Sequence, residues 1–238
     1  MTAVRPKHET FNQVFDTAYL VLMTNLLLVI ACLPFVAGLI VTDPTRSWPV
    51  LALVAPLSAP ALAAAFTVFA QFSAHGTTTV VRIFAAAWRS LFRRAATIGA
   101  LTVGALVVLG VDGRAVWPNP LGAVAIPVIV TLAVLVISTA TLALVGVVDR
   151  PGARVRDLLR AALYLAVRRW YLTAVSLCVL GLLVALVAAR PALGLGLGAA
   201  PLLYVVWANS RYALSPALDP ARATSAHGPR RRPGAWTG

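Results

Sequence analysis

Long stretches without any ionisable residue set the strongest constraint on how this chain can fold. Six segments contain no Asp, Glu, Lys, Arg or His and are long enough, or nearly so, to cross about 30 Å of hydrocarbon. These segments are Ala18–Val41, Val50–Phe72, Ala95–Val111, Gly122–Val148, Tyr171–Ala189 and Ala192–Asn209. They do not alternate apolar and polar residues, as strands of a membrane barrel do, so each one predicts a helix. The sequence therefore predicts an all-α polytopic membrane bundle with six transmembrane helices.

Composition excludes the other broad classes of chain. Hydrophobic residues make up 60 % and charged residues 11 %, and the mean hydropathy is +0.88. A soluble domain has about 45–50 % apolar and about 25 % charged residues, and a disordered chain is more polar and more highly charged. A chain this apolar lacks the polar surface needed to cover itself in water. We therefore expect it to lie in a bilayer.

The positive residues are distributed unequally between the segments that flank the apolar runs. Of the 20 Arg and Lys, 17 lie in the two termini and in the connections 73–94 and 149–170. Such an excess keeps segments on the cytoplasmic side. The chain is thus predicted to be a multi-pass protein of the cell (cytoplasmic) membrane with both termini in the cytoplasm. Its expected division is a cytoplasmic arm (1–17), a six-helix domain (18–209) and a basic, disordered cytoplasmic tail (210–238).

The net charge of +13 has an expected use that does not involve nucleic acid. Arginines beside apolar runs meet anionic lipid headgroups, so the bilayer surface is the predicted partner. Between residues 80 and 94, helical geometry puts Arg82, Arg89 and Arg93 within a narrow arc and Phe84, Ala87, Trp88 and Leu91 opposite to it. We expect an amphipathic interfacial helix here that binds anionic lipid through Arg82, Trp88, Arg89 and Arg93. A second, less regular helix of this kind is expected around Arg156–Arg169.

Residues that could carry out chemistry do not converge in this sequence. All seven acidic residues lie at span ends or in connections, and the three histidines are far apart. The two cysteines, Cys32 and Cys178, lie in apolar runs without a metal-binding spacing. The sequence therefore predicts no catalytic residues, no cofactor site and no metal site, and the chain is not expected to be an enzyme.

Two polar side chains inside the spans are the ones most costly to expose to lipid. Asn25 and Gln71 are expected to point into the bundle, where interhelical hydrogen bonds explain them. A polar lining for a substrate path is the alternative. Prolines at positions 34, 56, 60, 127 and 201 predict kinked spans, which form either a cavity or a purely structural bundle.

A glycine-rich stretch, Gly194-Leu195-Gly196-Leu197-Gly198, looks like part of a dinucleotide-binding loop. No strand precedes it and no acidic residue follows it at the expected distance. Gly194 and Gly198 are four residues apart, which is typical of close contacts between membrane helices. We therefore interpret the stretch as a packing surface.

Short motifs in the first half of the chain resemble those of a known family. They are Tyr19, Asn25-Leu26-Leu27-Leu28, Leu33-Pro34, Pro60-Ala61, Ala64-Ala65-Phe66 and Ile83-Phe84…Trp88…Leu91-Phe92-Arg93-Arg94. They resemble the YesL-like family of bacterial integral membrane proteins over about Phe11 to Leu106. A weaker match follows at Leu158-Leu159-Arg160-Ala161-Ala162-Leu163. The family has no known molecular function and contributes no catalytic residues.

The resemblance implies an association with sugar uptake, because members of that family are often found with sugar-uptake and polysaccharide-utilisation systems. The expected function is a non-enzymatic accessory to solute (carbohydrate) uptake, with a sugar-uptake transport complex as partner. The alternative is a small transporter or channel in its own right, with the kinked first two spans around Asn25 and Gln71.

Overall fold

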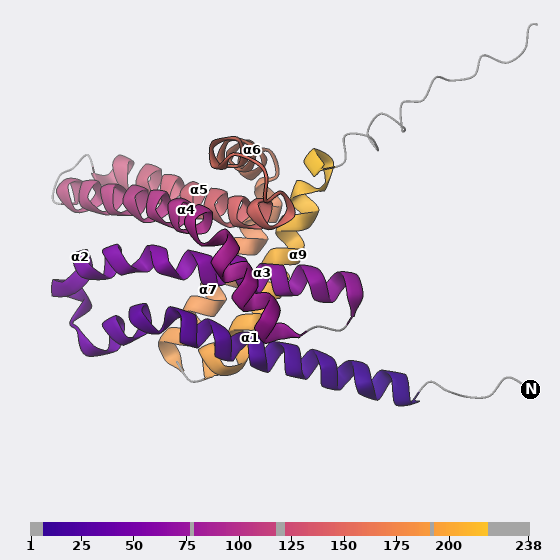
Figure 1. Cartoon of the computed structure of the whole chain (residues 1–238). Coiled ribbons are helices and arrows are strands. Elements are labelled where there is room, and N and C mark those ends of the chain that lie inside the picture. The colour runs from indigo at the N-terminus through magenta and orange to yellow at the C-terminus, as the bar shows by residue number, and fades with distance from the viewer. Residues whose placement is uncertain (1–6, 77–78, 118–121, 191–192, 219–238) are drawn as a thin grey trace, which may run out of the picture.

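The computed structural model describes residues 7–76, 79–117, 122–190 and 193–218, and these form helices and short turns without any strand (Figure 1). The predicted all-α architecture is confirmed for this part of the chain. The elements in chain order are α1 (Lys7–Val41), α2 (Pro44–Val54), the 3-10 turn η1 (Ala55–Leu57), α3 (Ser58–His75), α4 (Val80–Val116), α5 (Gly122–Asp149), α6 (Val155–Arg168), α7 (Trp170–Ala189), the π-helical segment η2 (Gly194–Gly198) and α9 (Ala199–Leu218).

Five helical segments are long and apolar enough to cross a membrane. They are Phe15–Leu39, Arg46–His75, Val80–Val116, Gly122–Asp149 and Trp170–Ala189, and they contain the first five predicted spans almost entirely. The sixth predicted span falls on η2 and α9, which do not meet the same criterion. The residues Asn209, Ser210 and Arg211 lower the hydropathy of α9. The structure therefore fits a membrane-embedded protein with at least five apolar helices.

The helices run back and forth, so the bundle has two ends (Figure 1). At one end α1 begins, α3 connects to α4, α5 connects to α6, and α9 ends. We call this the basic end, because most of the described arginines lie there. Two predicted boundaries, at residues 17 and 209, fall inside helices, since α1 already begins at Lys7 and α9 continues to Leu218. Residues 219–238 of the predicted tail lie outside the described residues.

The two amphipathic segments differ from each other in the structure. The expected helix over residues 80–94 is present, but it is continuous with the third apolar run and forms the first part of the 37-residue helix α4. No Gly or Pro between Val80 and Thr97 interrupts this helix. The second segment does form its own helix, α6, which ends at Arg169 with φ −114° and ψ 48°. Figure 1 shows α6 almost end-on while α4 and α5 run across the view, so α6 crosses α5.

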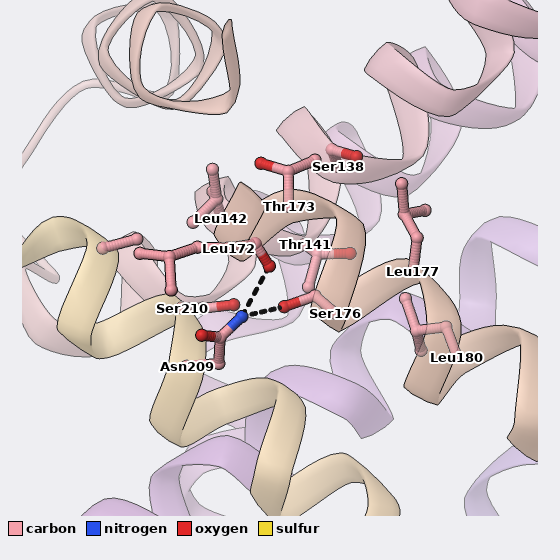
Figure 2. Close-up of a pocket in the computed structure, with 11 residues that line it drawn as sticks. Ser138, Thr141, Leu142, Leu172, Thr173, Ser176, Leu177, Leu180, Asn209 and Ser210 are labelled. Atoms are coloured by element: carbon pink, nitrogen blue, oxygen red, sulfur yellow. Dashed lines mark hydrogen bonds between the residues drawn. The ribbon is translucent and has the colours of Figure 1, made fainter. Parts of the chain in front are cut away.

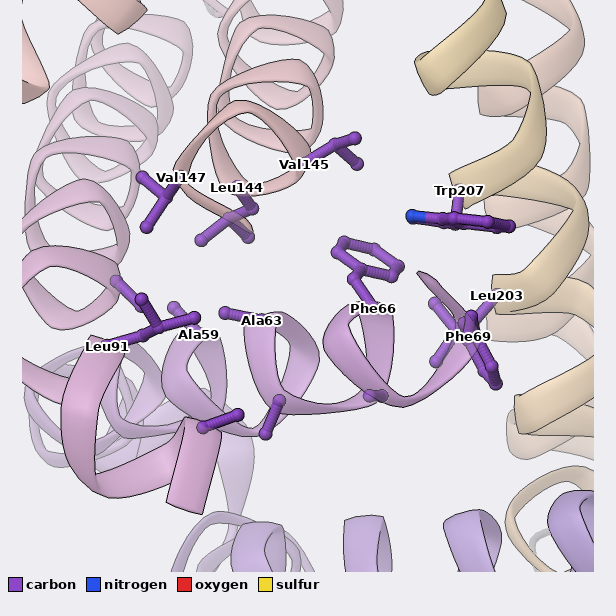
Figure 3. Packing of buried hydrophobic residues seen from close by; sticks show 14 of the residues in the cluster. Ala59, Ala63, Phe66, Phe69, Leu91, Leu144, Val145, Val147, Leu203 and Trp207 are labelled. Carbon is purple, nitrogen blue, oxygen red and sulfur yellow. The ribbon is translucent and has the colours of Figure 1, made fainter. Parts of the chain in front are cut away.

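Small side chains let α3 lie close to its neighbours at the centre of the bundle (Figure 3). Phe66 and Phe69 of α3 are buried, with Phe66 between Val145 of α5 and Trp207 of α9, and Phe69 beside Leu203 of α9. The rings of Phe69 and Tyr204 meet edge to face with their centroids 5.5 Å apart. Close packing continues at Gly99 of α4, where an added Cβ would lie 2.8 Å from the Cβ of Ala59. The core of the described chain is therefore built around α3.

The predicted kink in the second apolar run is present. The turn η1 separates α2 from α3 and contains Pro56, which lacks the N–H that a continuous helix would use. The hydroxyl of Ser58 donates to the carbonyl of Ala55 over 2.6 Å and so satisfies one acceptor in the turn. By contrast, Pro34 and Pro127 lie within α1 and α5 without ending them.

The glycine-rich stretch is a packing surface, as its sequence context predicted. A Cβ on Gly194 would lie 2.8 Å from the backbone N and Cα of Val187 in α7. A Cβ on Gly198 would lie 2.6 Å from the Leu186 side chain. The backbones of η2 and α7 therefore approach to a distance that only glycine permits.

We predict different effects for two alanine substitutions in this segment. Gly194→Ala should lower the free energy of unfolding by about 1–3 kcal/mol, because the methyl group meets the backbone of α7. Gly196→Ala is the matched control, since its Cβ would have no atom within 4 Å. Unfolding followed by circular dichroism in mixed detergent micelles measures both changes. Equal destabilisation by the two variants would contradict this packing.

Candidate functional site

The basic face of α4 is arranged as its sequence indicated. Arg82, Arg89 and Arg93 are exposed, while Phe84 and Leu91 on the other side are 5 % and 7 % exposed and join the core. This apolar side packs on the bundle itself, chiefly on α3 and α5. The arginines thus remain available to a headgroup or another anion, and lipid binding by them stays a prediction.

Trp88 lies between the basic face and the core. The side chain is partly buried, and its ring meets that of Phe92 edge to face with centroids 5.2 Å apart. Its indole N–H is covered by protein atoms and has no acceptor among the described residues. Trp88 therefore contributes to packing in this structure. Its fluorescence would depend mainly on the surrounding protein and less on lipid.

Arg82 and Gln71 line one groove of about 610 Å³ at the basic end of α3 and α4. The hydroxyl-bearing residues Thr67, Thr79 and Ser90 also line it, and Val148 of α5 and Pro151 close one side. Gln71 is exposed here, so it does not point into the bundle as its sequence suggested. One guanidinium, one amide and several hydroxyl groups suit a polar or anionic group presented from the basic side.

Asn25 is buried, as predicted, and it joins the first helix to the last. The side chain is 1 % exposed. Its Nδ2 donates to the carbonyl of Gly196 over 2.8 Å, and its Oδ1 accepts from the N–H of Ala200 over 2.6 Å. In an uninterrupted α-helix these two backbone groups would bond to each other. The amide of Asn25 therefore replaces one backbone hydrogen bond at the junction of η2 and α9.

Asn25 and Gln71 do not line a common path. Asn25 bonds to backbone groups at the contact of α1 with η2, whereas Gln71 faces the open groove at the basic end. This separation removes the geometric support for a substrate path that uses both residues. Interhelical hydrogen bonding explains Asn25.

A second polar cluster lies between α5, α7 and α9 and was not predicted as a site (Figure 2). The amide nitrogen of Asn209 donates to the carbonyl of Leu172 over 2.6 Å and to the hydroxyl of Ser176 over 2.7 Å. The hydroxyl groups of Ser138 and Thr141 donate to backbone carbonyls of their own helix. The cavity among them is about 10 Å³, roughly the room for one water molecule. The signal in the sequence was the presence of polar residues in three successive apolar runs.

Arginines near the double-arginine motif 168–169 contact aromatic rings and α9. Arg169 donates to the carbonyl of Tyr212 over 3.2 Å, and its guanidinium lies 6.0 Å from the centre of that ring. Arg168 donates to the hydroxyl of Tyr164 over 2.9 Å. Arg211 lies 5.4 Å from the Trp207 ring and attracts the half-buried carboxylate of Asp149. The contact between Arg169 and Tyr212 ties the junction of α6 and α7 to the end of α9, whereas Arg168 and Arg211 contact rings of their own helices.

No group of three His, Cys, Asp or Glu side chains that could hold a metal ion occurs within the described ranges. Cys32 and Cys178 are free thiols on different helices, α1 and α7. The polar groups that do come together are amides, hydroxyls and backbone carbonyls. Their arrangement stabilises contacts between helices.

Replacing Asn25 tests its structural role. Asn25→Leu should lower the free energy of unfolding by at least about 1 kcal/mol, because it leaves the Gly196 carbonyl and the Ala200 N–H unpaired. Thr24→Val is the matched control, since the Thr24 hydroxyl is buried without a partner in the described chain. Unfolding in mixed micelles should show little change for Thr24→Val. If Asn25→Leu were as stable as the native chain, the bridge would not matter energetically.

Comparisons with known proteins found no relative for this chain. No family model matches the sequence, no curated protein matches it, and no solved structure matches the fold. The resemblance to the YesL-like family therefore stays an expectation that rests on the motifs in residues 11–106. Any function must be argued from the geometry of the described residues.

Proposed function

We propose that the chain is a six-span protein of the cell membrane, with both termini in the cytoplasm, that acts as a non-enzymatic accessory to a solute-uptake system. The observation that carries this proposal is that the polar groups inside the bundle bond helices to each other and do not line a path. Asn25, Ser176 and Asn209 form hydrogen bonds between helices, and the cavity beside Asn209 has room for only about one water molecule. The interior is built for packing, and the polar surface is presented at the basic end.

The position of α9 supports a sixth span. This helix packs against α1, α3, α5 and α7, which belong to four of the five apolar segments. Its residues Leu203, Val206 and Trp207 are almost completely buried. A helix that packs on four spans shares their depth in the bilayer. Ser210 is buried on the inner side of α9 and Asn209 bonds to α7, so neither polar group needs to face lipid.

The orientation follows from the charge distribution. The basic end collects the arginines of the first part of α4, of α6 and of the end of α9, so it is the end expected in the cytoplasm. Arg46 and Arg114 lie toward the other end.

Reporter fusions test this topology. A reporter fused after Gly238 should be active only as a cytoplasmic reporter, and one inserted beside Arg46 or Arg114 should be active only outside the cytoplasm. The reason is that 17 of the 20 positive residues belong to one set of alternate segments. Alkaline phosphatase and green fluorescent protein serve as complementary reporters. An external signal from the C-terminal fusion would contradict six spans.

The link to carbohydrate uptake rests on the family resemblance, and the basic end offers a surface for such a role. The groove with Arg82 and Gln71 opens there, beside the exposed face with Arg89 and Arg93. An acidic segment of a transport complex would complement this surface. The anionic headgroups of the inner leaflet would hold the same end at the membrane.

A small transporter or channel is the second candidate, and one observation favours it. The π-helical segment η2 interrupts the last helix inside the bundle, and such interruptions occur frequently at functional sites. A rearrangement around η2 would be needed to open a path.

Uptake measurements separate the two candidates. We expect that deleting the gene slows carbohydrate uptake by intact cells, that the native chain restores it, and that the purified chain in liposomes produces no solute flux. Flux of a radiolabelled sugar with the purified chain alone, abolished in Asn25→Leu but not in Thr24→Val, would instead support the transporter. Normal uptake of all sugars tested without the gene would contradict the accessory role.

A further inference from the structure

An apolar groove with two arginines at its rim lies under the crossing helix α6. Its volume is about 470 Å³, and its lining comes from Leu101 of α4, Thr139 of α5 and the α6 residues Val155, Arg156, Leu159, Arg160 and Leu163. A volume of this size falls in the range of about 300–1,000 Å³ that is usual for small-molecule sites. The groove is separate from the one that contains Arg82 and Gln71.

The depth of the groove matches the edge of the hydrocarbon layer. Leu101 is 55 % exposed and lies about 10 Å farther along α4 than Arg94, on the apolar part of that helix. The α6 residues lie on the helix that crosses α5 at the basic end (Figure 1). The floor of the groove is thus apolar and faces outward, while its rim is at the level of the arginines.

The two arginines suit one phosphate group. Arg156 and Arg160 are four residues apart on α6, so they are neighbours on one face of the helix. Both are exposed, and neither has an ion-pair partner in the part of the chain that the structure describes. Asp157 is also exposed on this helix and reduces the local positive charge. Guanidinium groups bind phosphate oxygens through two hydrogen bonds at once, which a single ammonium group cannot do.

We propose that this groove, which we name the α6 groove, binds one anionic phospholipid. The phosphate lies between Arg156 and Arg160, and an acyl chain lies along Leu101, Leu159 and Leu163. The occupant is a lipid because the groove combines an apolar floor at hydrocarbon depth with positive charge directly at its rim. A second copy of the chain fits poorly, since each copy has a net charge of +13 and only seven acidic residues.

The experiment measures which lipid lies beside α6. Val167 is 60 % exposed and is one turn beyond Leu163, so a fluorophore on Val167→Cys lies near the groove without filling it. The two native cysteines are replaced first, by Cys32→Ala and Cys178→Ser. The labelled chain is reconstituted in phosphatidylcholine vesicles that contain spin-labelled phosphatidylglycerol or spin-labelled phosphatidylcholine. The ratio of quenching gives the local preference for the anionic lipid.

We expect a clear preference for phosphatidylglycerol that depends on the two rim arginines. Each arginine near the surface contributes a factor of about 5, so Arg156→Gln with Arg160→Gln should lower the local association constant about 30-fold. Asp157→Asn should raise it, because it removes the one negative charge beside the rim. The double lysine variant, Arg156→Lys with Arg160→Lys, keeps the charge and should retain much of the preference, which shows that α6 is still in place.

A matched control and a competitor make the outcome decisive. Arg89→Gln with Arg93→Gln removes the same charge from the basic face of α4 and should leave quenching at position 167 unchanged within about twofold. Inorganic phosphate should not displace the lipid, because it cannot occupy the apolar floor. The proposal is overturned if both double glutamine variants lose the preference equally, if phosphate competes, or if the native chain shows no preference. The last result would mean that bulk lipid or a second copy covers the groove.

Discussion

The bond between Asn25 and the last helix is the contact on which the packing of the bundle depends. In hydrocarbon no water can satisfy a backbone group that leaves the helical pattern. At the start of α9 the Ala200 N–H donates to the Asn25 side chain, and Pro201 has no N–H at all. The side chain of Asn25, 171 residues away from Gly196, supplies the missing donor and acceptor together. Without it the interruption at η2, which lets Gly194 lie against α7, would leave polar groups unpaired inside the bundle.

The arginines of the basic end divide into three groups that do different things. Arg168, Arg169 and Arg211 contact aromatic rings, and the contact of Arg169 with Tyr212 joins the junction of α6 and α7 to α9. Arg82, Arg89 and Arg93 of α4 face outward, opposite an apolar side that is already packed on the bundle. Arg156 and Arg160 of α6 border an apolar groove that no described residue fills. Net charge alone cannot separate these roles. They differ in what lies next to each guanidinium group: an aromatic ring, a packed helix face or an open apolar groove.

Length and hydropathy were enough to predict five of the helices, because a charge-free run of this length is typical of a helix that crosses a membrane. The same reasoning placed Asn25 inside, because an amide in contact with lipid is costly. Its partner could not be predicted, since pairing between α1 and η2 depends on how distant helices pack. Residues 80–94 were assigned to a separate helix because of their amphipathicity, but periodicity does not show where a helix ends, and here it runs on into the third span. Gln71 was expected inside the bundle because it belongs to a charge-free run. In the structure α3 extends beyond the core at that residue, so the side chain is exposed.

The length of the apolar part of α4 indicates the thickness of the bilayer that surrounds the protein. Arg93 and Asp112 are about 28 Å apart along its axis, so the helix fits an ordinary bilayer while nearly upright. The part of its neighbour α5 that faces lipid has a similar length, because Leu142–Val147 at the end of that helix are buried within the protein. On α1, by contrast, the exposed apolar side chains extend from Phe15 to Leu39, about 36 Å along the axis. The apolar surface that faces lipid is therefore shorter along α4 than along α1. Either the bilayer is thinner beside α4, or α1 tilts away from the membrane normal.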